Sequence, residues 1–311
     1  IGHAPFSHVL ENTLIHGITH EEISLMMMQR INDEMHGELN LAIKIFKDEY
    51  AKKFLHQLIS SQLDVDRLDY LRLDSFFTGV TEGNIGSERI IKMLNVVDDS
   101  LVVESKAIYS IENYLTSRRL MYWSVYLHKT VVAYERTLIN CIRRAEYLAK
   151  QGWDIFASPA LKYFLYNDIN ADWFTSHPEA LDMYSQLDDS DIWSAVKVWA
   201  QSDDKLLSML ADDVINRHIF KVEVREEPVS DEEQHELRKS LAEKAGISYD
   251  DAGYLMSVNT IQKDMYDIND DHISILYKDG TIKDITEASE LLNVDLLSKK
   301  VRKYYLCYQR F

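Results

Sequence analysis

The segment of residues 105–150 contains neither glycine nor proline, and it constrains the fold more than any other part of the sequence. Proline interrupts helices because it lacks an amide hydrogen, and glycine does so because its backbone is conformationally free. We therefore expect one very long helix here, or two nearly collinear ones. The whole chain has only 4 prolines and 10 glycines in 311 residues, so long helices should dominate the fold.

One stripe of this predicted helix combines cations with phenol rings. Its members recur at i, i+4, i+8 and i+11, and they are Arg118, Tyr122, Tyr126 and Lys129. They fall within roughly 80° of one another on a helical wheel. Such a stripe can grip phosphate oxygens and pack against a sugar or a base. On these residues alone, an exposed stripe with half-buried tyrosines is the simpler interpretation. His128, one step off the stripe, is interpreted as structural.

A second helix should begin near Asp66, within residues 62–74. On this helix Arg67, Tyr70 and Asp74 are spaced i, i+3 and i+7, so they share one face. That face offers a cation, an aromatic ring with a hydroxyl, and a carboxylate, while Asp66 at the helix start is a candidate metal ligand. The pattern suits a substrate-binding surface. It is equally typical of a solvated helix start with acidic residues near the positive end of the helix dipole.

The first 20 residues place three histidines and a glutamate near turns and helix ends: His3, His8, His20 and Glu11. Ser7 is expected to cap a short helix on which His8 and Glu11 are i, i+3 neighbours. Thr19 and Glu22 have the spacing of a capping box, which puts His20 in the first turn of the next helix. A glutamate that orients a histidine can move a proton to or from water or a leaving oxygen. Each histidine taken alone is more often structural.

Charge and cysteine content limit the partners. The formal net charge of −17 disfavours nucleic acid and anionic membrane surfaces. A small anionic substrate remains compatible if local cations or a metal ion reverse the field at the site. The two cysteines, Cys141 and Cys307, argue against a disulfide framework and suit a reducing, cytoplasmic compartment. No run approaches the roughly 18 apolar residues of a membrane span.

The character of the chain changes after residue 216. Residues 151–217 should complete a helical body, whereas 219–224 alternate as a strand does. Residues 230–245 form a charged amphipathic helix, and 273–277 with 281–285 form a hairpin. We therefore predict a mainly α fold with a helical domain at 1–217 and a smaller α+β region at 218–311. The tail carries a basic cluster, interpreted as an oligomer or effector contact: Lys299, Lys300, Arg302, Lys303 and Arg310.

Two stretches together, IGHAPFSH at 1–8 and DVDRLDYLRLD at 64–74, resemble the HD-domain superfamily of metal-dependent phosphohydrolases. More narrowly, they are similar to the dGTPase-like deoxynucleoside triphosphate triphosphohydrolases, whose first motif reads His-Asp-Ile/Leu-Gly-His-Gly-Pro-Phe-Ser-His. The likeness continues through the stripe at 118–129 and into the α+β tail, so it covers most of the chain. It implies an HD-domain helical bundle that hydrolyses deoxynucleoside triphosphates to deoxynucleoside and inorganic triphosphate.

The resemblance also implies a role for each motif residue. Asp66 would be a metal ligand with Asp64 in support, and the divalent metal could be Mg, Mn, Fe, Zn or Ni. The residues of the implied proton relay are His3, Glu11 and His20. The residues implied to contact phosphate are His8, Arg67 and Arg118. Tyr70 and Asp74 would hold the sugar 3′-hydroxyl, and Tyr126 would crowd a 2′-hydroxyl. Tyr122 and Lys129 would be further substrate contacts.

The sequence departs from the family pattern at its start. The family's His–Asp pair would immediately precede Ile1, with another metal-binding histidine further upstream. We therefore expect the chain to be part of a longer protein and to be inactive by itself. Ala4 stands where the family commonly has glycine, which should be harmless.

The resemblance implies a homo-oligomer and leaves room for a nucleotide effector. Two other functions stay open. One is a different HD phosphohydrolase, acting on a phosphomonoester, a cyclic nucleotide or an alarmone. The other is a nucleotide-binding regulator without catalysis.

Overall fold

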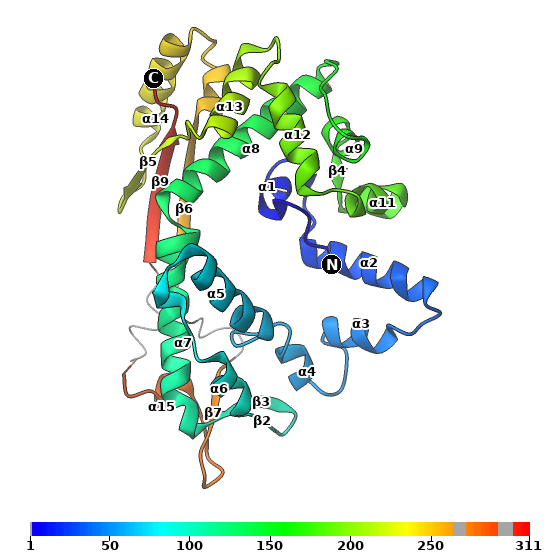
Figure 1. The fold of residues 1–311 in the computed structure, drawn as a ribbon, viewed down its shortest axis with the longest axis vertical. Coiled ribbons are helices and arrows are strands. Elements are labelled where there is room, and N and C mark those ends of the chain that lie inside the picture. The colour runs from blue at the N-terminus through cyan, green and yellow to red at the C-terminus, as the bar shows by residue number, and fades with distance from the viewer. Residues whose placement is uncertain (1, 264–265, 267–271, 292–300) are drawn as a thin grey trace. The chain divides into compact units, whose positions relative to one another are not determined.

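The computed structural model describes residues 2–263, 266, 272–291 and 301–311. The chain forms two compact units. Unit 1 comprises residues 1–39, 129–260 and 303–311, and unit 2 comprises residues 40–128 and 261–302. Helices dominate both units and the sheets are small, so the predicted mainly α fold with α+β elements toward the C-terminus is confirmed (Figure 1). Both units contain residues from either side of position 217, and the domain boundary there stays a prediction.

Unit 1 contains most of the helical body. Its helices are α1 (Ser7–Glu11), α2 (His20–Glu34), α8 (Lys129–Lys150), α9 (Pro159–Tyr166), α10 (Ala171–Ser176), α11 (Glu179–Ser185), α12 (Asp189–Trp199), α13 (Lys205–Asn216) and α14 (Asp231–Ala245), with the 3₁₀ turn η4 (Asp251–Leu255). A two-stranded parallel sheet pairs β1 (Ile15–His16) with β4 (Ile169–Asn170). A three-stranded sheet has the order β5 (Lys221–Arg225), β9 (Val301–Tyr308) and β6 (Met256–Lys263).

Helix α8 is the centre of unit 1 because its middle is buried on every side, over residues 137–142. Its buried apolar residues include Val132, Leu138, Ile142 and Leu148. Each such side chain stabilises the fold by roughly 1.5–3 kcal/mol when fully buried. The helix contacts α1, α9 and α13, and Figure 1 shows α13 lying along α8. This packing holds α1, which carries two of the predicted site residues.

Unit 2 consists of shorter helices and a four-stranded sheet. Its helical elements are α3 (Asn40–Phe46), α4 (Phe54–Gln57), α5 (Val65–Thr78), η1 (Thr81–Gly83), α6 (Ser87–Lys92), η2 (Ser105–Ala107), α7 (Ile108–Met121), the π-helical turn η3 (Tyr122–Tyr126) and α15 (Ile285–Ala288). The sheet order is β2 (Leu94–Val97), β3 (Ser100–Glu104), β7 (Ser274–Leu276) and β8 (Ile282–Asp284). Strands β3 and β7 are parallel, and the two outer pairs are antiparallel, so the predicted hairpin is present as β7–β8.

Of the two alternatives predicted for 105–150, the single long helix is wrong, because the segment contains two separate helices. Helix α7 ends at Met121, the π turn η3 follows, and α8 begins only at Lys129. The interruption needs neither glycine nor proline. The amide of Leu127 donates to the carbonyl oxygen of Tyr122 (2.7 Å), and this i→i+5 bond replaces the α-helical i→i+4 pattern. The predicted stripe is therefore divided: Lys129 belongs to unit 1, and its other three members belong to unit 2.

Of the two predicted helix starts near the N-terminus, one is confirmed and one is wrong. The Thr19–Glu22 capping box is present and places His20 in the first turn of α2, as predicted. Ser7 does not cap α1. Phe6 occupies the cap position in a left-handed conformation, and no side chain accepts the free amides there. The Ser7 hydroxyl instead donates to the Ala4 carbonyl oxygen (2.7 Å).

Candidate functional site

Unit 1 gathers the four predicted residues of the N-terminal motif. The ring centroids of His3 and His20 lie 4.7 Å apart, and His8 lies 5.8 Å from His3 and 5.7 Å from His20. Glu11 joins them, since its Oε1 accepts hydrogen bonds from the ring Nδ1 (2.7 Å) and the backbone amide (3.0 Å) of His20. The other oxygen lies 3.4 Å from His8 Nδ1. The capping box at the start of α2 thus positions His20 beside the Glu11 carboxylate of α1.

The electrostatics of this histidine cluster suit proton transfer. Burial of Glu11 acts to raise its pKa, but the hydrogen bonds from His20 and His8 outweigh burial and lower the pKa below its usual value. Partial burial lowers the pKa of His3, and the neighbouring rings of His20 and His8 lower it further. Glu11 is therefore an ionised acceptor, and His3 is a neutral imidazole near neutral pH, the form that can take up a proton.

The same cluster has the donor set of a cation site. One ligand atom each from His8, Glu11 and His20 lies within 4.8 Å of the other two. In addition, His20 Nε2 lies 3.1 Å from a carboxylate oxygen of Glu21. Imidazole nitrogens and carboxylate oxygens are the ligands that Zn²⁺ and similar divalent ions accept.

Unit 2 gathers the predicted sugar-contacting residues between α5 and α7, which lie side by side (Figure 1). Tyr126 donates a hydrogen bond to a carboxylate oxygen of Asp74 (2.6 Å). The ring of Tyr126 meets those of Tyr70 (6.1 Å between centroids) and Tyr122 (5.5 Å) edge to face. Burial raises the pKa of Tyr70 to about 12, and burial with the Asp74 contact raises the pKa of Tyr126 also. These phenols stay protonated at neutral pH and can donate hydrogen bonds.

Arg118 lies in the same tyrosine cluster with part of its guanidinium unpaired. Its Cζ atom is 5.9 Å from the ring centroid of Tyr122. The Nε and Nη1 atoms are buried and have no hydrogen-bond partner among the described residues. A buried unpaired donor costs about 1–3 kcal/mol, and more when it is charged. An incoming anion would relieve this cost.

The start of α5 is built by Asp64 rather than by Asp66. Asp64 is buried, and its Oδ1 caps the helix by accepting from the Arg67 amide (2.8 Å). The Arg67 guanidinium contacts both the Asp64 carboxylate and the Ser61 carbonyl oxygen. Asp66 lies in the first turn of α5 and is exposed, so its carboxylate is accessible to a metal ion. One carboxylate is not a complete ligand set, so the residues described in unit 2 fit a metal only as part of a larger set.

Lys129 lines a basic pocket in unit 1. The pocket has a volume of about 640 Å³, and its cationic lining residues are Lys129, Arg217, Lys221 and Arg310. Arg217 ends α13 in a left-handed conformation (φ 58°). Arg310 belongs to the basic tail, whereas Lys299 and Lys300 of that tail lie outside the described residues. This pocket is a concentration of positive charge in a strongly acidic chain.

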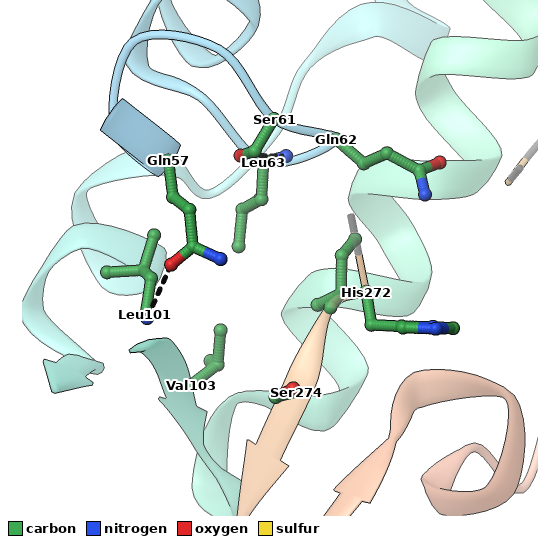
Figure 2. A pocket seen from close by; sticks show the side chains of 9 residues that line it. Gln57, Ser61, Gln62, Leu63, Leu101, Val103, His272 and Ser274 are labelled. Carbon is green, nitrogen blue, oxygen red and sulfur yellow. Dashed lines mark hydrogen bonds between the residues drawn. The ribbon is translucent and has the colours of Figure 1, made fainter. Parts of the chain in front are cut away.

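A cavity beside the loop that precedes α5 is too small to be a substrate site. Figure 2 shows its lining by Gln57, Leu63, Val103 and Ser274, with the Gln57 side chain accepting from the Leu101 amide (2.8 Å). Its volume of about 20 Å³ accommodates roughly one water molecule. It belongs to the packing between the loop and the β3–β7 pair.

Two buried tyrosines contact the predicted site residues or their loops, and the sequence analysis did not predict a role for them. Tyr114 precedes Arg118 by one helical turn and donates to the Gln62 carbonyl oxygen (2.6 Å), tying α7 to the loop before α5. Tyr184 donates to the Gly2 carbonyl oxygen (2.7 Å) beside His3. The i, i+4 spacing from Arg118 could have indicated Tyr114. No local pattern indicates Tyr184, because its partner is 182 residues away.

Comparison with known proteins gives a consistent group of relatives. A sequence family described as the HD associated region matches residues 85–153. The chain is 63% identical to a phosphohydrolase of known crystal structure from Bacteroides thetaiotaomicron, with a TM-score of 0.96 over 99% of this chain and 77% of that one. It is 28% identical to the uncharacterized protein YwfO of Bacillus subtilis, over 99% of this chain and 70% of YwfO.

A more distant relative has a named activity. The chain is 26% identical to the deoxynucleoside triphosphate triphosphohydrolase SAMHD1 homolog of Dictyostelium discoideum over 168 residues, which is 48% of this chain and 32% of that protein.

Proposed function

Since the chain belongs to the HD-domain phosphohydrolases, we propose that it hydrolyses deoxynucleoside triphosphates to deoxynucleoside and inorganic triphosphate. The observation that carries the proposal is the buried guanidinium of Arg118, two of whose nitrogens have no partner among the described residues. A triphosphate supplies anionic oxygens in the geometry that a guanidinium binds best. The distant relative named for this activity supports the same substrate class.

The tyrosines around Arg118 suit the deoxyribose. In the proposed complex Tyr70 and Asp74 hold the 3′-hydroxyl, with the phenol donating and the carboxylate accepting. Tyr126 is anchored to Asp74 at 2.6 Å, and its ring packs against C2′, where a ribose would carry a hydroxyl. Tyr122, in edge contact with the Tyr126 ring, is assigned to the same pocket. Arg67 would leave its contacts with Asp64 and Ser61 to reach a phosphate.

The histidine cluster supplies proton transfer in this proposal. Water attacks the α-phosphorus, the bond from phosphorus to the sugar O5′ breaks, and O5′ takes up a proton. His3, neutral near pH 7 because of its lowered pKa, accepts the proton of the attacking water. The Glu11–His20 pair delivers a proton to the leaving oxygen, and His8 contacts the phosphates. When bound, a divalent metal supplies charge stabilisation at the phosphate, and Asp66 is its assigned ligand.

The basic pocket of unit 1 is the proposed place for a nucleotide effector. Four cations line it, namely Lys129, Arg217, Lys221 and Arg310. Its volume of about 640 Å³ lies within the usual range for small-molecule sites. Lys129, predicted as a substrate contact, also lines this pocket, where it could contact the phosphates of the effector. A homo-oligomeric state and a cytoplasmic location complete the proposal, in keeping with the buried free thiols of Cys141 and Cys307.

Product analysis tests the proposed reaction. The natural full-length protein is incubated with each deoxynucleoside triphosphate and a divalent metal, and the products are separated by anion exchange. Nucleoside and triphosphate should appear in equal amounts. Orthophosphate or pyrophosphate as the product would instead indicate another HD phosphohydrolase, and tight nucleotide binding without turnover would indicate a regulator.

A further inference from the structure

The loop that carries His3 is held by one buried hydroxyl from a distant helix. Tyr184 of α11 is only 4% exposed. Its hydroxyl donates to the Gly2 carbonyl oxygen (2.7 Å) and accepts from the Ala4 amide (3.3 Å). The peptide groups on both sides of His3 are thus fixed by a single oxygen atom. This contact sets the position from which the imidazole projects.

The Ser7 hydroxyl determines which ring nitrogen of His3 carries hydrogen. Ser7 is 3% exposed, and its only hydroxyl hydrogen is donated to the Ala4 carbonyl oxygen (2.7 Å), which can only accept. Ser7 Oγ also lies 2.9 Å from His3 Nδ1. Ser7 must therefore accept in that contact, and Nδ1 must donate. The neutral ring then carries its hydrogen on Nδ1 and its lone pair on Nε2.

The loop that carries His3 also packs against helix α2, which carries His20. The Gly2 amide donates to Ser24 Oγ (2.8 Å). A Cβ atom on Gly2 would lie 2.5 Å from both the His20 carbonyl oxygen and Ser24 Oγ, so only glycine allows this approach. His3 and His20 are consequently positioned against one helix end, with their ring centroids 4.7 Å apart.

We propose that Ser7 and Tyr184 are positioning residues for His3, which together present its Nε2 atom as the proton acceptor. Ser7 selects the tautomer through Nδ1, and Tyr184 fixes the backbone on either side of the ring. Neither side chain needs to touch the substrate. The catalytic consequence rests on the role proposed above for His3, whereas the tautomer assignment depends only on the hydrogen bonds.

Imidazole nitrogen NMR tests the tautomer directly. In the full-length protein labelled with ¹⁵N-histidine, a His3→Gln variant identifies the signals of His3. The wild-type ring should show a protonated Nδ1 and an unprotonated Nε2 near pH 8. Ser7→Ala should shift the ring toward a mixture of tautomers, and Thr13→Val should not. Thr13 is an equally buried α1-flanking hydroxyl that donates to the Val9 carbonyl oxygen (2.8 Å) and does not contact His3.

Kinetics test the functional consequence with a matched pair of tyrosines. Tyr166 repeats the Tyr184 arrangement elsewhere, since its hydroxyl donates to the Trp153 carbonyl oxygen and accepts from the Ile155 amide, both at 2.8 Å. Tyr184→Phe and Ser7→Ala should lower kcat by about 10-fold or more with little change in KM, because a misplaced base slows only the proton transfer. Tyr166→Phe and Thr13→Val should keep kcat within about 2-fold at a comparable loss of Tm.

Two results would overturn the inference: a wild-type His3 with its hydrogen on Nε2, or kcat losses that the two control variants share. If the wild-type protein releases no triphosphate, the proposed function fails, and the NMR comparison still decides whether Ser7 and Tyr184 set the state of His3.

Discussion

Tyr126 makes two separable contributions, one through its ring and one through its hydroxyl. The hydroxyl is bonded to Asp74, and the ring is packed against Tyr70 and Tyr122. If the ring crowds a 2′-hydroxyl, Tyr126→Ala should relax discrimination against ribonucleotides by about 10-fold or more, within the range that steric selection achieves. The ratio of kcat/KM for each deoxynucleotide and its matching ribonucleotide measures this.

The matched variant for that experiment is Tyr126→Phe, which keeps the ring. It should retain the ratio of kcat/KM values for deoxynucleotide and ribonucleotide. It should also weaken substrate binding, because Asp74 loses the hydrogen bond that holds its carboxylate in place. An unchanged ratio in Tyr126→Ala would remove Tyr126 from its assigned role.

Asp213 should make the free energy of unfolding decrease as pH rises, which is the opposite of the usual effect of a carboxylate. It is 5% exposed and accepts a hydrogen bond from Gln309 (2.8 Å). Burial raises its pKa to about 6, despite the opposing effects of Gln309 and His218. The unfolded value is about 3.9. Because the folded pKa is the higher one, the stability from the neutral form is complete below about pH 4 and is lost as pH rises through about 6.

Asp213→Asn should therefore stabilise the protein at pH 8 but not below about pH 4. Asparagine remains neutral and can still accept from Gln309. The expected gain at pH 8 is about 1 kcal/mol, or a rise in Tm of roughly 2–4 °C. Thermal unfolding at both pH values measures it, and the exposed neighbour variant Asp212→Asn should change little. A gain of equal size near pH 4 would contradict the assignment.

Residues within short motifs were predictable from the sequence, and residues that act through distant contacts were not. His3, Glu11 and His20 lie within one 20-residue stretch, so their spacing alone predicted a cluster. The contact that places Tyr184 beside His3 joins residues 182 positions apart. Burial and pairing over such a separation depend on the complete tertiary fold.

At the scale of elements, α5 depends on a glycine at its C-terminal end. Gly79 has φ +71°, and a Cβ atom there would meet nothing within 4 Å. Gly79→Ala should therefore cost about 1 kcal/mol of folding free energy through backbone strain alone. Gly79→Asn should cost less, since asparagine tolerates this conformation better. Denaturant unfolding of the three proteins measures the order, and equal stability of the alanine and glycine forms would contradict it.

The start of α2 was predictable because its capping signal is local, whereas the start of α1 and the end of α7 were not. The Thr19–Glu22 box satisfies free amides within three residues. The π turn at 122–126 follows an uninterrupted run of residues that helices tolerate. Sequence composition alone predicts no break there, because the run contains neither glycine nor proline.

At the scale of the whole molecule, the proposed roles are distributed over residues of both units. The histidine cluster belongs to unit 1, and Arg118 with its tyrosines belongs to unit 2. The net charge of −17 repels a triphosphate in general, so local cations such as the buried Arg118 must offset this repulsion. If each proposed role is correct, loss of a residue from either group should lower the activity.

We therefore expect His20→Ala in unit 1 and Arg118→Ala in unit 2 each to lower triphosphate release by about 100-fold or more while the protein stays folded. His20→Ala should act mainly on kcat, because it removes the partner of Glu11. Arg118→Ala should also raise KM, because it removes a phosphate contact. Arg119→Ala, one residue along α7, is the matched control and should keep most of the activity. If Arg118→Ala released triphosphate at the wild-type rate, Arg118 would have no part in the reaction, and the observation that carries the proposed function would be lost.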